Sequence, residues 1–217
     1  MLSKHDIEQY LQEINRQLEQ SGETGRILLT GGAAMALLFD ARDFTRDVDA
    51  VFNPKEDIRS IAASIAAEND LPSNWINSSV EIFIPDAHET VIVSQYSSLL
   101  VESVSPETLL AMKIAALRFD SKDLDDALFL LNHLEISTAN DLFAILEQYI
   151  HPRELSGVIG HNAQVVLLEY QARNKGDQQK DLTSLEQKER ELTKTQEALN
   201  NQQPSRNNKV ERDPHTK

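Results

Sequence analysis

Two short segments of this chain carry residues whose types and spacing suit phosphate and metal chemistry. The first, residues 28–32, reads Leu-Leu-Thr-Gly-Gly and is predicted to be a short buried strand that runs into two glycines. Residues 33–39 are apolar and are predicted to form a helix behind the glycines. The second segment, residues 44–52, is predicted to be another strand, and it contains Asp47 and Asp49.

Side chains alternate between the two faces of a strand, so Asp47 and Asp49 should point the same way. Two adjacent carboxylates repel each other unless a cation shares them, and Mg²⁺ prefers such oxygen ligands. Glycines let the backbone approach a ligand closely, and a helix start directs free N–H groups at an anion. The pattern predicts a nucleotide-transferring site. The alternative is that the aspartates are only polar residues on the solvent face of an edge strand.

This order of elements resembles the signature of the minimal nucleotidyltransferases: a strand, Gly-Gly, a short helix, and Thr-x-Asp-x-Asp on the next strand. The resemblance continues through Leu109-Leu110-Ala111-Met112-Lys113 and through Lys122-Asp123-Leu124-Asp125-Asp126. With these runs the chain is similar to the nucleotidyltransferase-like proteins of bacterial abortive-infection and toxin–antitoxin systems. The similarity spans roughly residues 27–131.

The resemblance implies a Mg²⁺-dependent transfer of NMP from an NTP to an acceptor, which could be RNA, a protein or a small molecule. Asp47 and Asp49 would bind the metal. The residues that would hold the nucleotide phosphates are Thr30, Gly31, Gly32, Thr45 and Arg46. Arg46 could instead form a salt bridge with a nearby acid, and Arg42 is also close enough in sequence to reach a phosphate.

Lys113 lies in an otherwise apolar stretch of a predicted helix, so it must either extend to solvent or meet an anion. The resemblance implies that Lys113 binds a phosphate and that Asp123 belongs to the catalytic residues. Asp123 and Asp126 are three positions apart and share a helix face. Their alternative role is to stabilise a helix N-terminus, where acidic side chains favour the helix dipole.

The chain departs from the family pattern in one respect. Most members carry a third carboxylate on a neighbouring strand, whereas Glu81 and Glu102 are the only acids within the later strand-like segments, and neither lies in a clear motif. This departure keeps a second interpretation open, in which the chain is a catalytically degenerate binding module or an antitoxin-like partner protein.

The predicted fold class is α+β: a small mixed β-sheet flanked by helices, a helical C-terminal half and a polar tail. Residues 1–104 are expected to form the nucleotidyltransferase-like core with an N-terminal helix, and residues 105–171 a helical region packed on it. Helices are predicted over residues 4–19, 33–39, 57–68, 108–119, 122–134, 140–150 and 154–171. The predicted strands span residues 27–30, 44–52, 80–84, 90–93 and 99–104.

Composition adds expectations about environment and partners. The chain has no cysteine, no apolar leader and no membrane-length apolar run, so a cytoplasmic protein without membrane contact is expected. The net charge is −14, and residues 1–171 carry 27 acidic against 11 basic side chains. Such acidity argues against a broad duplex-DNA footprint and suits a basic protein partner.

Residues 172–217 are polar and lack aromatic side chains. Leu185, Leu192 and Leu199 are seven residues apart and could form a weak coiled-coil seam. The alternative is a solvated helix or disorder, and residues 200–217 are expected to be disordered.

Overall fold

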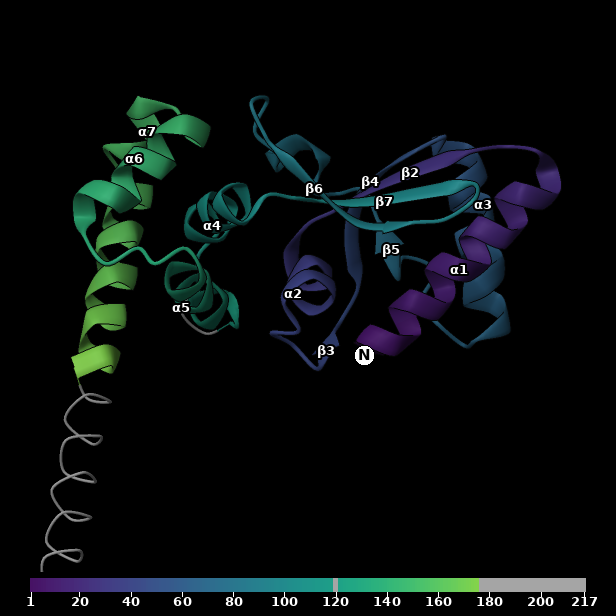
Figure 1. Ribbon diagram of the computed structural model, residues 1–217, viewed down its shortest axis with the longest axis horizontal. Coiled ribbons are helices and arrows are strands. Elements are labelled where there is room, and N and C mark those ends of the chain that lie inside the picture. The colour runs from purple at the N-terminus through teal and green to yellow at the C-terminus, as the bar shows by residue number, and fades with distance from the viewer. Residues whose placement is uncertain (119–120, 176–217) are drawn as a thin grey trace, which may run out of the picture. The chain divides into compact units, whose positions relative to one another are not determined.

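The computed structural model describes residues 1–118 and 121–175 (Figure 1). The chain divides into two compact units, Met1–Gln171 and Ala172–Lys217. All of the strands and helices that position the candidate site belong to the first unit. The predicted leucine seam and the predicted disorder of residues 200–217 lie outside the described residues.

Five strands form a mixed sheet in the order β5–β4–β2–β7–β6. They are β2 (Gly25–Leu29), β4 (Val48–Asn53), β5 (Ile76–Asn77), β6 (Thr90–Gln95) and β7 (Leu99–Val104). β2 runs antiparallel to β4 and parallel to β7, while β4 and β5 are parallel and β6 and β7 antiparallel. A separate antiparallel pair joins β1 (Leu2–Ser3) to β3 (Phe44–Thr45). β4, which carries Asp49, is therefore an internal strand of the larger sheet.

Helix α1 (Lys4–Ser21) begins at a capping box in which Ser3 and Asp6 exchange hydrogen bonds. It ends at Gly22, whose φ of +74° is the left-handed conformation typical of a helix C-terminus. The helix predicted over residues 4–19 is confirmed, and its buried residues Ile7, Leu11, Ile14 and Leu18 form one apolar stripe. This stripe packs α1 against α3 (Lys55–Glu68) and β7.

Three helices support the strands that carry the candidate site. Figure 1 shows α1 and α2 (Gly31–Phe39) below the strands and α3 beside α1, and α2 and α3 both contact β4. Along β4 the side chains of Val48, Ala50 and Phe52 are buried, whereas Asp49 and Val51 are half-buried. The alternation leaves Asp49 on the face of β4 that is more open to solvent.

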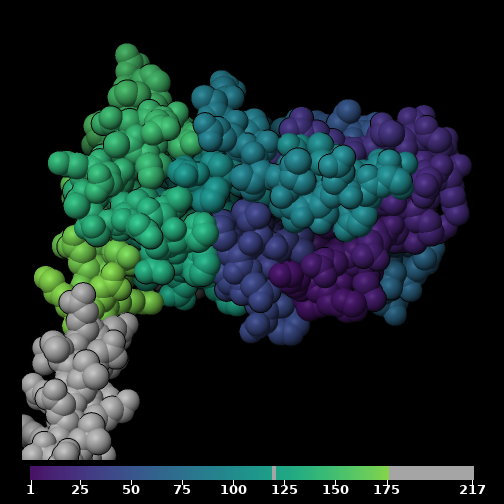
Figure 2. All heavy atoms as spheres, viewed as in Figure 1, coloured from purple at the N-terminus to yellow at the C-terminus, as the bar shows by residue number. Residues whose placement is uncertain are grey.

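The C-terminal half of the first unit is helical. Its helices are α4 (Pro106–Ala115), α5 (Asp123–His133), α6 (Ala139–Tyr149) and α7 (Pro152–Leu155), and residues 158–171 are also helical. α4 packs against α5 and α6. α5 also reaches α2, because the Phe39 ring meets those of Phe129 and His133 edge-on at 5.6 and 4.8 Å between centroids. In Figure 2 the residues of α5 and α2 meet at the surface.

The α+β fold class predicted from the sequence is confirmed, but two local predictions are wrong and one strand of the larger sheet was missed. Residues 80–84 do not form a strand: Glu81–Phe83 form a 3₁₀ turn, η1. The predicted strand over residues 44–52 divides into β3 and β4, so Asp47 lies in a bend just before β4 instead of on it. The two-residue strand β5 was not expected. In the described part of the chain no helix is long and apolar enough to cross a membrane.

Candidate functional site

The glycine turn after β2 lies directly against the carboxylate of Asp49. Gly31 has a φ of +58°, a conformation that L-residues with side chains rarely adopt. A Cβ atom at Gly31 would lie 3.0 Å from Asp49 Oδ2. Thr30 is fully buried and fixes the turn, because its N–H donates to the Asp49 carbonyl oxygen at 2.9 Å and its hydroxyl donates to the same oxygen at 3.3 Å. The predicted strand, glycine turn and Asp-x-Asp segment therefore do converge.

The start of α2 supplies hydrogen-bond donors at the same place. Thr30 is the N-cap residue but makes no side-chain cap hydrogen bond. Ala34 N–H donates to the Thr30 carbonyl oxygen, so the N–H groups of Gly31, Gly32 and Ala33 have no acceptor within the helix. Such N–H groups, together with the positive end of the helix dipole, favour binding of a phosphate.

Gly32 is closely surrounded by polar atoms of Thr45 and Arg42. A Cβ atom at Gly32 would lie 2.5 Å from Thr45 Oγ1 and 3.0 Å from Arg42 Nη1. Thr45 is buried, and its hydroxyl donates to the Asp47 carbonyl oxygen at 3.1 Å. The absence of a side chain at Gly32 thus lets both groups approach the start of α2.

This contact makes a testable prediction about Gly32. Gly32→Ala should lower the free energy of unfolding, because the added methyl group would lie 2.5 Å from Thr45 Oγ1. Such overpacking costs about 1–3 kcal/mol, which exceeds the roughly 1 kcal/mol gain in helix propensity. Thr45→Ala removes the atom nearest the added methyl group, so the double variant should be more stable than the sum of the single changes by about 1 kcal/mol. Urea unfolding of the four proteins measures this coupling. Additive effects would contradict the close contact.

Asp47 and Asp49 form a carboxylate pair although only Asp49 lies within a strand. Both side chains are half-buried. Burial, and secondly the charge of Asp49, raises the pKa of Asp47 above its ordinary value, and the charge of Arg46 only partly offsets this. The two carboxylates therefore sense each other electrostatically.

The donor chemistry of this pair fits Mg²⁺ bound together with a substrate phosphate. Mg²⁺ in such sites takes one or two protein carboxylates and completes its coordination with phosphate oxygens and water. Among residues 1–118 and 121–175, no group of three or more His, Cys, Asp or Glu side chains is arranged to hold a metal ion. Asp47 and Asp49 are the two carboxylates that could hold such an ion together with a phosphate.

Asn77 is a member of the site that the sequence did not reveal. It lies on β5 beside Asp49, and its Nδ2 atom donates to Asp49 Oδ1 at 3.2 Å. β5 has only two residues, which is too short for a periodic pattern in the sequence to predict it. An asparagine therefore stands next to the carboxylate pair.

Lys113 meets carboxylates of the chain itself. Its side chain is buried, and its Nζ atom lies 3.0 Å from Asp123 Oδ1 and 2.8 Å from Asp126 Oδ2. Of the two roles considered for a lysine in this apolar stretch, contact with an anion is correct, and the anions are Asp123 and Asp126. Burial raises the pKa of Asp123, but hydrogen bonds from Ser121 and then Lys113 outweigh it and leave that pKa below its ordinary value.

Arg42 links this cluster to the glycine turn. Its Nε atom donates to Asp126 Oδ1 at 2.8 Å, and its Nη2 atom pairs with Asp126 Oδ2. Gly32, Arg42, Asp126, Lys113 and Asp123 therefore form a continuous chain of contacts.

Not every predicted phosphate-binding group joins this chain of contacts. Arg46 is exposed, and its charge acts on Asp47. Thr45 is buried beside Gly32, and the structure places its hydroxyl against the Asp47 backbone. From the sequence, either Arg42 or Arg46 could reach a phosphate. In the structure it is Arg42 that lies at the glycine turn.

The two acids weighed as a third carboxylate are both paired elsewhere. Glu81 lies in η1 and forms an ion pair with Lys55, with an Oε2–Nζ distance of 2.7 Å. Glu102 is buried on β7, where it pairs with Arg26 and accepts a hydrogen bond from the Thr90 hydroxyl at 3.0 Å. Neither Glu81 nor Glu102 therefore adds a third carboxylate to Asp47 and Asp49.

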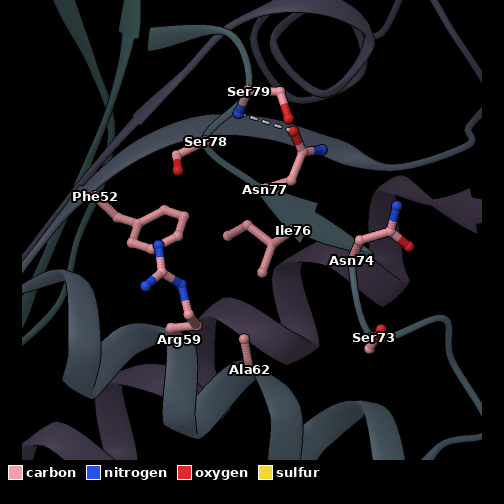
Figure 3. A pocket seen from close by; sticks show the side chains of 9 residues that line it. All are labelled: Phe52, Arg59, Ala62, Ser73, Asn74, Ile76, Asn77, Ser78 and Ser79. Atoms are coloured by element: carbon pink, nitrogen blue, oxygen red, sulfur yellow. Dashed lines mark hydrogen bonds between the residues drawn. The ribbon is translucent and has the colours of Figure 1, made fainter.

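A pocket of about 360 Å³ opens beside β5 (Figure 3). Its lining residues do not include Asp47 or Asp49. Its walls come from the end of β4, from α3 and from the segment around β5. The lining residues are Phe52, Arg59, Ala62, Ser73, Asn74, Ile76, Asn77, Ser78 and Ser79. This lining has no carboxylate side chain. Asn77 is common to the pocket and the site.

A scan against models of protein families and a search of functionally curated proteins found no match to the chain.

Proposed function

We propose that this chain is a Mg²⁺-dependent nucleotidyltransferase, which moves NMP from an NTP to an acceptor hydroxyl. The observation that carries the proposal is the approach of the Gly31 backbone to the Asp49 carboxylate at the N-terminus of α2. This approach supports the proposal, because N–H groups at a helix start suit a phosphate and a nearby pair of carboxylates suits a hard cation. NTP transfer chemistry requires both functions at one point.

The residues have distinct roles in the proposed reaction. The free N–H groups of Gly31 and Gly32 bind phosphate oxygens of the NTP, and Arg42 supports them with positive charge. Asp47 and Asp49 would hold Mg²⁺, which would supply positive charge to offset the negative charge that develops on the leaving pyrophosphate. Asp126 on α5 holds Arg42 in place, and Lys113 joins Asp126 to Asp123.

In the proposed transfer, one bond to phosphorus forms as another breaks. The acceptor oxygen forms a bond to the α-phosphorus while the bond from that phosphorus to the β-bridging oxygen breaks. Pyrophosphate leaves, and the hydroxyl proton passes to water. RNA, a protein side chain and a small molecule remain the acceptor classes. The family resemblance favours a toxin–antitoxin or phage-defence role in the cytoplasm, with a protein partner.

Two observations favour a second function, that of a non-catalytic nucleotide-binding module. Asn77 stands where a further carboxylate would assist the metal, and Lys113 is engaged by Asp123 and Asp126. In this alternative the chain binds NTP and Mg²⁺ without turnover and presents the complex to a partner protein.

Thermal unfolding with each of the four NTPs, with and without Mg²⁺, tests the proposal. A ligand at one hundred times its Kd contributes about 2.7 kcal/mol of stability. For a chain of this size that is a shift of roughly 5–10 °C in the melting temperature. We expect such a shift with Mg²⁺ and one or more NTPs together, and a smaller one with either alone.

Release of pyrophosphate then separates the two functions. Release in the presence of cellular RNA, protein or metabolites supports transfer, and stabilisation without release supports the binding module. If no NTP gives a metal-dependent shift, the nucleotide site itself is wrong.

A further inference from the structure

Asn77 is held in one orientation against Asp49. The register of β4 and β5 pairs the two residues, so their side chains leave the sheet on the same face. Asn77 Oδ1 accepts a hydrogen bond from the Ser79 N–H at 3.1 Å (Figure 3). Because a backbone N–H can only donate, Ser79 fixes which end of the amide is oxygen. The amide NH₂ group must therefore face the Asp49 carboxylate.

This orientation decides what can bind on the β5 side of Asp49. The donor hydrogens of Asn77 carry partial positive charge and point at Asp49 Oδ1. A cation approaching that oxygen from β5 would meet those hydrogens in place of oxygen ligands. A carboxylate in the same position would instead add negative charge and a further ligand.

The charge of the site leads to the same conclusion. Asp47 and Asp49 contribute two negative charges when both are ionised, which match one divalent cation. A two-metal clamp brings two cations about 3.5–4 Å apart, and the protein must help to neutralise both. Glu81 and Glu102 are paired with Lys55 and Arg26, so neither adds to the site.

We infer that Asn77 is a positioning residue that aims Asp49 and limits the site to one divalent cation, held jointly with the nucleotide phosphates. The inference rests on the proposed nucleotide site and specifies its metal content. It assigns Asn77 a role through Asp49 and no contact with the reacting atoms.

Two substitutions at Asn77 should act in opposite directions on metal binding. Asn77→Ala removes the donor that orients Asp49, and loss of such a supporting partner typically weakens metal binding by about tenfold or more. Asn77→Asp keeps the size and the Ser79 contact but adds a carboxylate beside Asp49. In the absence of nucleotide, Asn77→Asp should therefore bind the cation about tenfold more tightly than the wild type does. A purely structural role would make both variants worse.

Equilibrium dialysis with Mn²⁺, which shares the oxygen-ligand preference of Mg²⁺, measures these effects directly. The protein is dialysed with and without a non-hydrolysable NTP, and the excess Mn²⁺ on the protein side is counted. We expect one Mn²⁺ per bound nucleotide for the wild type and tight binding of Mn²⁺ alone only for Asn77→Asp. Asn74→Asp is the matched control, because Asn74 is exposed and receives the same charge three residues away.

The outcomes separate this inference from the proposed function. Two Mn²⁺ ions per nucleotide in the wild type would overturn the single-ion inference and leave the nucleotide site intact. So would an unchanged affinity in Asn77→Ala, or an equal gain in Asn77→Asp and Asn74→Asp. If the wild type retains neither nucleotide nor Mn²⁺, the proposed function fails and the inference fails with it.

Discussion

Replacing both Asp47 and Asp49 with asparagine is expected to abolish the joint stabilisation by Mg²⁺ and NTP, and to abolish any NMP transfer. The ligand-free protein should be as stable as the wild type or slightly more so. The reason is that asparagine keeps the shape of the side chain but removes the charge that binds the cation. It also removes a repulsive pair, since burial and the Asp49 charge raise the pKa of Asp47.

The sign of the pH dependence follows from that raised pKa. Where the folded-state pKa of an aspartate exceeds the unfolded value, ionisation costs folding free energy. The penalty is absent below the unfolded pKa, develops as the pH rises through the folded pKa, and persists above it. Asp47→Asn should therefore gain stability relative to the wild type at neutral pH and lose this advantage in acid. An advantage that grows in acid would contradict the assigned direction.

A matched control separates the site from the general change in charge. Asp70→Asn with Asp86→Asn makes the same change in net charge at two exposed positions. This control should keep the joint effect of Mg²⁺ and NTP. A loss of the effect in both double variants would show that the response reports total charge instead of the site.

The second large effect is expected at Asp126. This carboxylate is buried between Arg42 and Lys113 and is ion-paired with both. Asp126→Asn leaves two largely buried cations with one carboxylate fewer, and breaking a buried ion pair typically costs about 3–5 kcal/mol. The melting temperature should fall by roughly 10 °C, as measured by calorimetry.

The same change should also weaken the nucleotide site, because Asp126 holds Arg42 beside Gly32. Glu147→Gln, at an exposed position of α6, is the control and should change neither property. Stability that is unaffected by Asp126→Asn would show that the ion cluster does not join the two halves of the unit.

The parts of the site that follow from local sequence were predictable. Gly31, Gly32 and Asp49 converge because a strand, a glycine turn, a helix and a second strand succeed one another within a short stretch. Helix α1 likewise follows from local signals, namely the helical spacing of its apolar residues and the Ser3 cap at its start. Each of these signals involves residues a few positions apart.

The parts that depend on distant pairing were not predictable. The sequence left open whether Lys113 extends to solvent or meets an anion, and the packing of α5 against α4 brings Asp123 and Asp126 to it. Asn77 lies in a strand too short to give a pattern, and it acts only through its register with Asp49.

The apolar run at residues 80–84 shows a different limit. Strand prediction assumes that such a run is buried against a partner, whereas Ile82 is 83% and Phe83 67% exposed in the 3₁₀ turn. Local hydrophobicity therefore indicated a strand that the tertiary fold does not provide.

The most direct test of the nucleotide–metal site is a crystal structure of the protein soaked with Mg²⁺ and a non-hydrolysable NTP. We predict one cation between Asp47 and Asp49, with the phosphates against the N–H groups of Gly31 and Gly32. A nucleotide bound elsewhere, or no nucleotide at saturating concentration, would contradict this assignment.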